Sequence, residues 1–205
     1  MKRLLLLMGL ALLLCGCSRE ESGPDIPDKE GIAPYKLSED QQELLGAFGM
    51  EDSANLFAFH APEEAVTVEV NAYRLTDTGT WEVTGNGAMS IGTERQPVSS
   101  LSGTIAMELR DDYSIDFNIS CAGRGSFSSE EIELEQEPLG STKGYLAEFR
   151  PIELNEEIPL AIMVYDSGTS MRSYTPQDYY DTSAFEDMDL AQAVTVRFSD
   201  KEIGE

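Results

Sequence analysis

Aromatic and charged residues gather in one long segment between two apolar runs, at residues 166–192. Rings beside carboxylates and an arginine suit a sugar or peptide site, because the rings give flat apolar contact and the polar groups fix orientation. The candidate ligand-binding residues are Arg172, Tyr174, Tyr179, Tyr180 and Phe185. The alternative interpretation is that these rings cap an open end of the hydrophobic core while the neighbouring acids face water.

The same segment carries acids whose oxygens suit Ca²⁺, a hard cation that binds carboxylate ligands. The candidate metal ligands are Asp181, Glu186, Asp187 and Asp189. The sequence contains no Asp-x-Asp-x-Asp-Gly loop, and a run of surface acids is typically only solvated. Apart from this calcium hypothesis, no cofactor is predicted.

Familiar catalytic motifs are missing from the sequence, so we predict no catalytic residues and no enzyme. Gly168-Thr169-Ser170 lacks the second glycine of a nucleophile elbow, and Ser141-Thr142-Lys143 has the wrong spacing for a Ser-x-x-Lys pair. Some pair among the 38 acids will match glycosidase geometry by chance, so an exported hydrolase is kept only as an outside hypothesis.

The first residues have the layout of an export signal. Lys2 and Arg3 give a positive start, and an apolar run follows at residues 4–14. As a helix at about 1.5 Å per residue this run is shorter than the roughly 30 Å hydrocarbon core of a membrane. We therefore predict a cleaved signal peptide over residues 1–16.

The end of the apolar run, Leu14-Cys15-Gly16-Cys17, resembles the lipobox of bacterial lipoproteins. In that motif an aliphatic residue, a small residue and Gly or Ala precede the cysteine that receives the lipid. The resemblance implies that Cys17 carries a diacylglyceryl group and palmitate-like acyl chains and becomes the mature N-terminus. Cys15 fits less well, because Leu14 would then occupy the position of the small residue. Two acyl chains are enough for stable anchoring, so an extracytoplasmic, membrane-anchored protein is expected.

The charge balance excludes nucleic acid as a direct partner. The 205-residue chain has 14 Lys and Arg against 38 Asp and Glu, a net charge of −24, whereas each phosphate contact needs a basic side chain. After export and acylation Cys121 would be the last free cysteine, so no internal disulfide is expected. His60 is the single histidine and is interpreted as a strand-end residue.

The remaining chain is divided into two parts. Residues 17–36 are predicted to be the lipidated Cys17 and an acidic, Pro- and Gly-containing tether, and residues 37–205 a single β-rich domain. Ser38 and Gln41 have the spacing of a capping box, which predicts a short N-terminal helix that ends at Gly49.

Beyond this helix the hydrophobic period is two. Apolar and polar residues alternate over 66–72, 105–109 and 115–121, turn signals recur, and the run 158–165 is apolar on both faces. This pattern predicts a mainly β fold, an antiparallel β-sandwich or open barrel with a short N-terminal helix.

The sequence thus predicts a non-catalytic binding or structural lipoprotein of the bacterial cell surface or envelope. Its partner would be a protein or a glycan, contacted through residues 166–192. The alternative is a lipoprotein that binds a small ligand, carbohydrate or Ca²⁺, with the same segment. The oligomeric state does not follow from the sequence.

Overall fold

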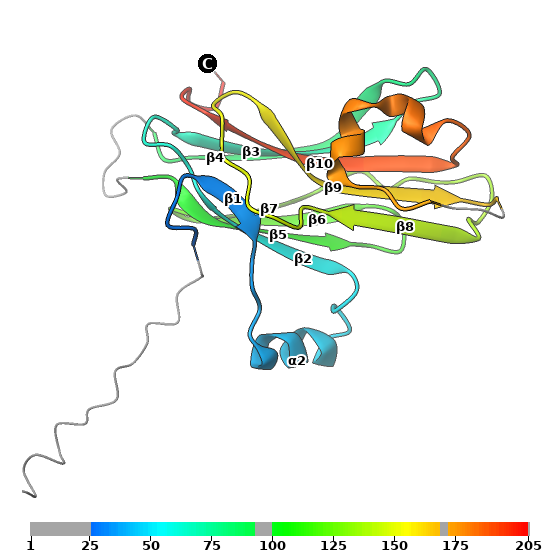
Figure 1. Cartoon of the computed structure of the whole chain (residues 1–205), viewed down its shortest axis with the longest axis horizontal. Helices are drawn as coiled ribbons and strands as arrows, with labels where there is room; N and C mark the ends of the chain where they lie inside the picture. Colours follow the sequence, from blue (N-terminus) through cyan, green and yellow to red (C-terminus); the bar gives the residue numbers. More distant parts are fainter. Residues whose placement is uncertain (1–25, 93–99, 169–171, 205) are drawn as a thin grey trace, which may run out of the picture.

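Two antiparallel sheets of five strands each face one another across a hydrophobic core (Figure 1). The computed structural model describes residues 26–92, 100–168 and 172–204. The mainly β fold and the antiparallel sandwich predicted from the sequence are confirmed, and the two sheets are not closed into a barrel.

The first sheet, sheet A, has the strand order β1-β2-β5-β6-β7. Its strands are β1 (Gly31–Pro34), β2 (Ala54–His60), β5 (Ser102–Leu109), β6 (Ile115–Ser120) and β7 (Arg124–Ser128). Alternate residues of β5 and β6 are buried, as their sequence period predicts. Phe117 of β6 is fully buried and stacks on Phe127 of β7 with ring centroids 4.9 Å apart.

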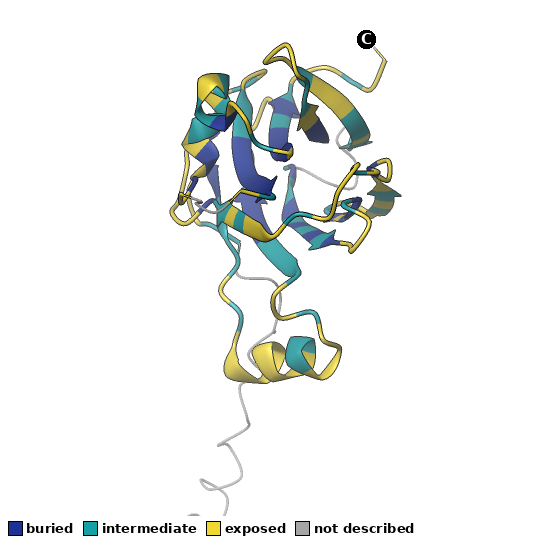
Figure 2. Cartoon of the chain, turned by 90° about the vertical axis from the view of Figure 1, so that its right-hand side faces the viewer, coloured by how far each residue is buried: buried dark blue, intermediate teal, exposed yellow. Residues whose placement is uncertain are grey.

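The second sheet, sheet B, has the order β4-β3-β10-β9-β8. Its strands are β3 (Thr67–Leu75), β4 (Trp81–Ser90), β8 (Gly140–Tyr145), β9 (Glu157–Asp166) and β10 (Leu190–Ser199). The C-terminal strand β10 lies between β3 and β9, and Figure 2 shows buried residues gathered between the two sheets. This insertion ties distant parts of the chain into one sheet.

Strand β9 is covered on both faces, as its doubly apolar sequence predicts. Leu160 and Met163 belong to the cluster between the sheets. Ile162 and Val164 point the other way and belong to a second hydrophobic cluster on the outer face of sheet B. That outer cluster needs a cover, which the segment after β9 supplies.

The N-terminal boundary of the folded domain differs from the sequence prediction. The tether was expected to run to residue 36, but Gly31–Pro34 forms β1 and pairs with β2. Ile32 is fully buried, and its backbone N–H and C=O both bond to Arg150 at 2.8 Å. Any tether is therefore shorter, because burial of one isoleucine and backbone pairing on both sides hold this stretch in the sandwich.

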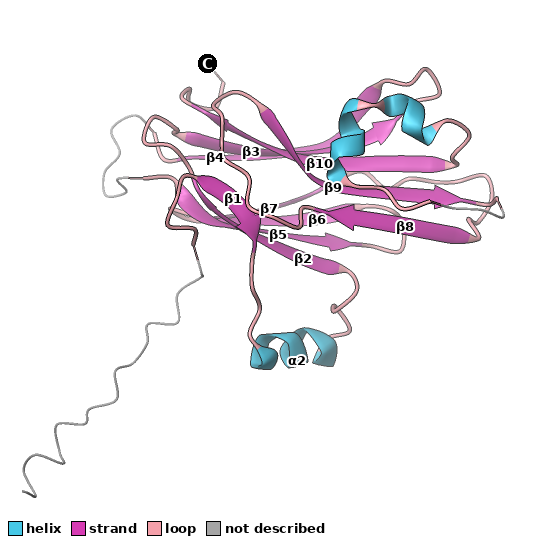
Figure 3. Cartoon of the chain, viewed as in Figure 1, coloured by secondary structure: helices cyan, strands magenta, loops and turns pink. Residues whose placement is uncertain are grey.

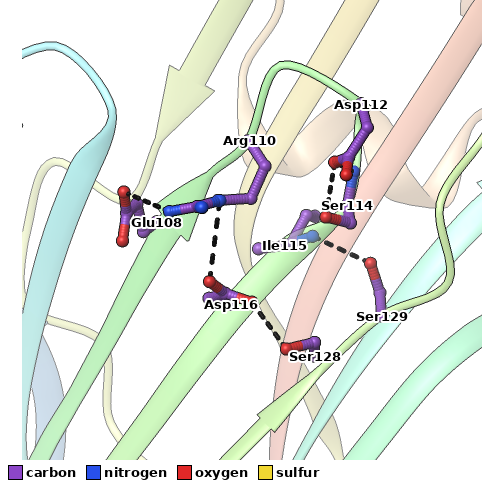
Figure 4. Close-up of polar contacts among 8 residues, drawn as sticks. All are labelled: Glu108, Arg110, Asp112, Ser114, Ile115, Asp116, Ser128 and Ser129. Atoms are coloured by element: carbon purple, nitrogen blue, oxygen red, sulfur yellow. Dashed lines mark hydrogen bonds and ion pairs between the residues drawn. The ribbon is translucent and has the colours of Figure 1, made fainter.

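The turn between β5 and β6 is fixed by side-chain hydrogen bonds (Figure 4). Asp112 accepts bonds from the Ser114 backbone N–H at 3.0 Å and from its hydroxyl at 2.6 Å, and these bonds lower the pKa of the Asp112 carboxyl. Arg110 lies between two carboxylates, with Nη1 3.0 Å from Glu108 and Nε 3.8 Å from Asp116. The hairpin thereby keeps Tyr113 at a positive φ of 63°.

The predicted N-terminal helix is confirmed as α2 (Glu39–Ala47), drawn in cyan in Figure 3. The Ser38 hydroxyl accepts from the Gln41 backbone N–H at 3.3 Å, and the Gln41 side chain accepts from the Ser38 N–H at 2.9 Å. Both bonds of the capping box are therefore present. Among the residues that the structure describes, no helix has the length and hydropathy needed to cross a membrane.

Candidate functional site

The predicted contact segment folds into two short 3-10 helices on the outer face of sheet B. They span Pro176–Tyr180 and Thr182–Phe185, and the first of them lies against β9 (Figure 3). Thr175 starts the first helix, since its backbone N–H and its hydroxyl both donate to Asp178, at 2.7 and 3.0 Å. Pro176 lies in the first turn of this helix, where a missing backbone N–H costs nothing.

Two of the predicted ligand-binding rings are buried by this arrangement. Tyr174 and Phe185 are 5% and 3% exposed, and they stack with centroids 5.2 Å apart. Both belong to the outer hydrophobic cluster with Tyr73, Ile162 and Val164. These rings therefore form part of a second hydrophobic core. This core covers the outer face of sheet B and does not close an open end of the sandwich.

Trp81 at the start of β4 holds the first 3-10 helix against the sheet. Its ring stacks on Tyr179 at 5.4 Å and meets Phe185 edge-on at 5.7 Å. Its indole N–H donates to the Tyr179 carbonyl oxygen at 3.0 Å. Tyr179 is therefore partly buried and fixed in both ring and backbone.

Two predicted residues remain at the surface. Tyr180 is 63% exposed, and its hydroxyl donates to the Glu157 carbonyl oxygen at 2.9 Å. Arg172 is exposed; it donates to the Ala184 carbonyl oxygen at 2.6 Å and lies 4.9 Å from the centre of the Tyr174 ring. Of the predicted aromatic residues, Tyr180 is the one that offers most of its ring to a ligand.

The carboxylate of Glu157 joins two tyrosines at this site. Tyr73 and Tyr179 donate to its two oxygens, at 2.5 and 2.6 Å. Burial, together with the hydrogen bond to Glu157, raises the pKa of Tyr73 to about 12. The same causes raise the pKa of Tyr179 even further. Both phenols therefore stay protonated and serve as hydrogen-bond donors.

These shifts predict how the tyrosines titrate. A phenol of an unfolded chain ionises near pH 10. Because the folded-state pKa is higher, the two phenols stabilise the fold fully below pH 10, and this contribution is lost as pH rises from about 10 towards 12. In Glu157→Gln we expect Tyr73 and Tyr179 to ionise at lower pH, measured by tyrosinate absorbance.

Tyr165 is an internal control for that measurement. Its pKa is also raised to about 12, but by burial and by Tyr145 and Tyr113, not by Glu157. Its late ionisation should persist in Glu157→Gln. An unchanged titration of all the tyrosines in the variant would contradict the assigned hydrogen bonds.

A polar strip continues along sheet B next to the tyrosines. Arg197 donates to Glu69 at 2.5 Å, and this bond raises the pKa of the arginine. The Asn86 amide donates to Glu69 at 2.7 Å and to Asn71 at 2.6 Å. A groove of about 380 Å³ runs beside the strip and is closed on one side by the chain after β10. These groups are suited to hydrogen-bonding a polar ligand.

The four predicted metal ligands are exposed, and the hydrogen bonds of Asp181 and Asp189 come from different parts of the chain. Asp181 accepts from the Ser183 hydroxyl, and Asp189 accepts from the Ser167 backbone N–H, both at 2.6 Å. Glu186, Asp187 and Asp189 border a groove of about 550 Å³ next to the β3–β4 turn. Within the described residues no three His, Cys, Asp or Glu side chains are arranged to hold a metal ion.

No family model, curated protein or solved structure matches this chain. Its role is therefore inferred from its own residues and their geometry. Sequence reasoning missed Tyr73, Glu157 and Arg197, which complete the site. A signal for Tyr73 existed, because it continues the positions of Glu69 and Asn71, which alternate with the apolar residues of β3 that face the core between the sheets.

Proposed function

We propose that this chain is a lipid-anchored, non-catalytic binding protein of the bacterial cell envelope. The observation that carries the proposal is the Leu14-Cys15-Gly16-Cys17 motif, placed directly after a charged start and an apolar run. These residues lie outside the described part of the chain. A diacylglyceryl group on Cys17 would hold the protein at the membrane without a spanning segment.

The position of β1 is consistent with such an anchor. β1 is the edge strand of sheet A, so the chain enters the sandwich at its margin. The α2 side of sheet A, and Tyr180 on the segment that covers sheet B, then remain accessible to a partner. Glu157 has a structural role here, because its two carboxylate oxygens accept hydrogen bonds from the phenols of Tyr73 and Tyr179.

Metabolic labelling with a fatty acid in a bacterial host tests the anchor. The two neighbouring cysteines provide a matched pair of variants. We expect label in the unmodified protein and in Cys15→Ser, and none in Cys17→Ser, because only Cys17 follows the glycine of the motif. The N-terminal residue of the labelled protein, read by mass spectrometry, should be the modified Cys17.

Label that persists in Cys17→Ser, or that disappears in Cys15→Ser, would show that the lipobox assignment is wrong. The hypothesis that residues 166–192 bind carbohydrate or Ca²⁺ stays a prediction, and its carbohydrate form depends on Tyr180, the exposed ring of the segment.

A further inference from the structure

Helix α2 lies outside the sandwich and has no buried residue (Figure 2). Leu44 is 58% exposed, and Phe48, which caps the helix, is 71% exposed. A helix of nine residues is marginal on its own and normally needs an apolar face packed against something else. The exposed side chains of α2 therefore indicate a surface that lacks its partner.

An apolar groove of about 370 Å³ lies between α2 and the outer face of sheet A. The helix side contributes Leu37, Leu44 and Leu45, and the sheet side contributes Leu56 of β2. Further along the same face, Thr104 and Ser120 line the floor. The groove thus offers a row of aliphatic side chains with hydroxyl groups at one end.

The charges on the helix side of the groove are almost all negative, whereas Arg124, the cross-strand partner of Ser120, places a base at the sheet end. Between residues 35 and 56, Lys36 is the single base, against the acids Glu39, Asp40, Glu43, Glu51 and Asp52. Asp40 lies one helical turn before Leu44 and so flanks the apolar row. Glu51 reaches the other end of α2, where its carboxylate lies beside Gly46. The helix side of the apolar surface therefore has an acidic rim.

This charge pattern decides between the occupants of the groove. A second copy of the chain would bring the same acids face to face, and each copy carries a net charge of −24. An anionic membrane surface would be repelled for the same reason. A segment that places leucine-like side chains between lysines or arginines would satisfy both the groove and its rim.

We propose that α2 and the groove beneath it bind a cationic, amphipathic segment of a partner protein. This inference deepens the proposed binding role by naming a surface and the chemistry of its partner. The apolar face of the segment would lie against Leu44, Leu45 and Phe48, and its bases would face Asp40 and Glu51.

The binding test uses the chain from Ser18 onward, which needs no detergent. The buried residues of both hydrophobic clusters lie between Ile32 and Phe198, so this chain keeps every described core contact. The probe is a synthetic peptide of leucine and lysine with leucine at helical spacing, and fluorescence anisotropy measures its affinity at about 0.15 M salt. A second peptide, with glutamate in place of lysine, is the charge control.

We expect the cationic peptide to bind and the anionic peptide not to bind. In the double variant Leu44→Gln/Phe48→Gln the affinity should fall about tenfold or more, a change of about 1.4 kcal/mol. Glutamine is a good helix former, so α2 should persist, which circular dichroism checks. In Asp40→Asn/Glu51→Gln the affinity should fall and depend less steeply on salt.

Leu139 and Val83 provide the matched control. They are 79% and 52% exposed; Leu139 lies just before β8 and Val83 on β4, both away from α2. Leu139→Gln/Val83→Gln should bind the cationic peptide as the unmodified chain does. An equal loss of affinity in this variant would overturn the proposal, as would equal binding of both peptides or no binding of the cationic one.

Two further measurements separate the other occupants. If the chain binds phosphatidylcholine vesicles through Leu44 and Phe48, or dimerises in sedimentation through them, the assigned partner is wrong. Fatty-acid labelling at Cys17 does not involve these residues, so failure of the peptide test leaves the lipid anchor untouched.

Discussion

Replacing Phe185 with alanine is expected to lower the free energy of unfolding by about 3–5 kcal/mol, the usual cost of removing a buried aromatic ring. Phe185 is 3% exposed and contacts both Tyr174 and Trp81 through its ring. Its loss would leave a cavity under the two 3-10 helices, which sheet B cannot close because its strands are fixed by their ladders. Denaturant unfolding measures the change.

Tyr180→Ala is the matched control for Phe185→Ala. Tyr180 belongs to the same segment, but its ring is 63% exposed. Its replacement should cost less than about 1 kcal/mol, since one hydrogen bond to the Glu157 carbonyl oxygen is lost at the surface. Similar losses in both variants would show that the segment does not pack as a second core.

Gly144→Ala is expected to lower the free energy of unfolding by about 1–3 kcal/mol, the usual cost of overpacking. Gly144 lies on β8, and a methyl group there would overlap the Tyr174 carbonyl oxygen. Because the obstacle is backbone, the chain at Tyr174 must move away from the sheet. Denaturant unfolding measures the loss, and increased fluorescence quenching of Trp81 reports the displaced cover.

Gly123→Ala gives the corresponding control. A methyl group at Gly123 would meet only the end of the Met89 side chain, at 3.5 Å, which is ordinary contact. This substitution should change stability by less than about 0.5 kcal/mol. The double variant Gly144→Ala/Phe185→Ala should lose less stability than the sum of the losses in the two single variants, because both substitutions act on the same cover. Simple additivity would contradict this coupling.

The strands with strict alternation were the predictable part of the fold. β5 and β6 each bury every second side chain, and β3 places Val68, Val70 and Ala72 in the core between the sheets, so one apolar face identifies these strands in the sequence. β9 was identifiable for the opposite reason, since both of its faces are apolar and both are covered. The capping residues Ser38 and Gln41 likewise encode their helix locally.

Two short edge strands were not predictable from local pattern. β1 contains a glycine and a proline among acidic residues, and it becomes a strand only because Ile32 enters the core and pairs with Arg150. β7, which includes Gly125, resembles a turn in sequence and is stabilised by the ring of Phe127 on Phe117. In both strands tertiary contact outweighs intrinsic propensity.

The candidate site shows the same limit. Tyr174 and Phe185 were recognised as unusual, but their burial depends on Trp81, which lies about a hundred residues earlier in the chain. Sequence period places Trp81 on a strand without showing which segment will cover it. Glu157 was missed because Glu156-Glu157 at the start of an apolar strand looks like a solvated end, whereas two phenols donate to Glu157 here.

The edge position of β1 also determines how the protein would carry mechanical load. A lipid at Cys17 and a partner on α2 would grip the chain on opposite sides of β1, so tension between them would run along this strand and bypass the centre of both sheets. The ladder to β2 and the two bonds between Ile32 and Arg150 would then carry little of the load, because the force follows the extended backbone of β1 itself. The sandwich would therefore stay folded while its anchor is pulled.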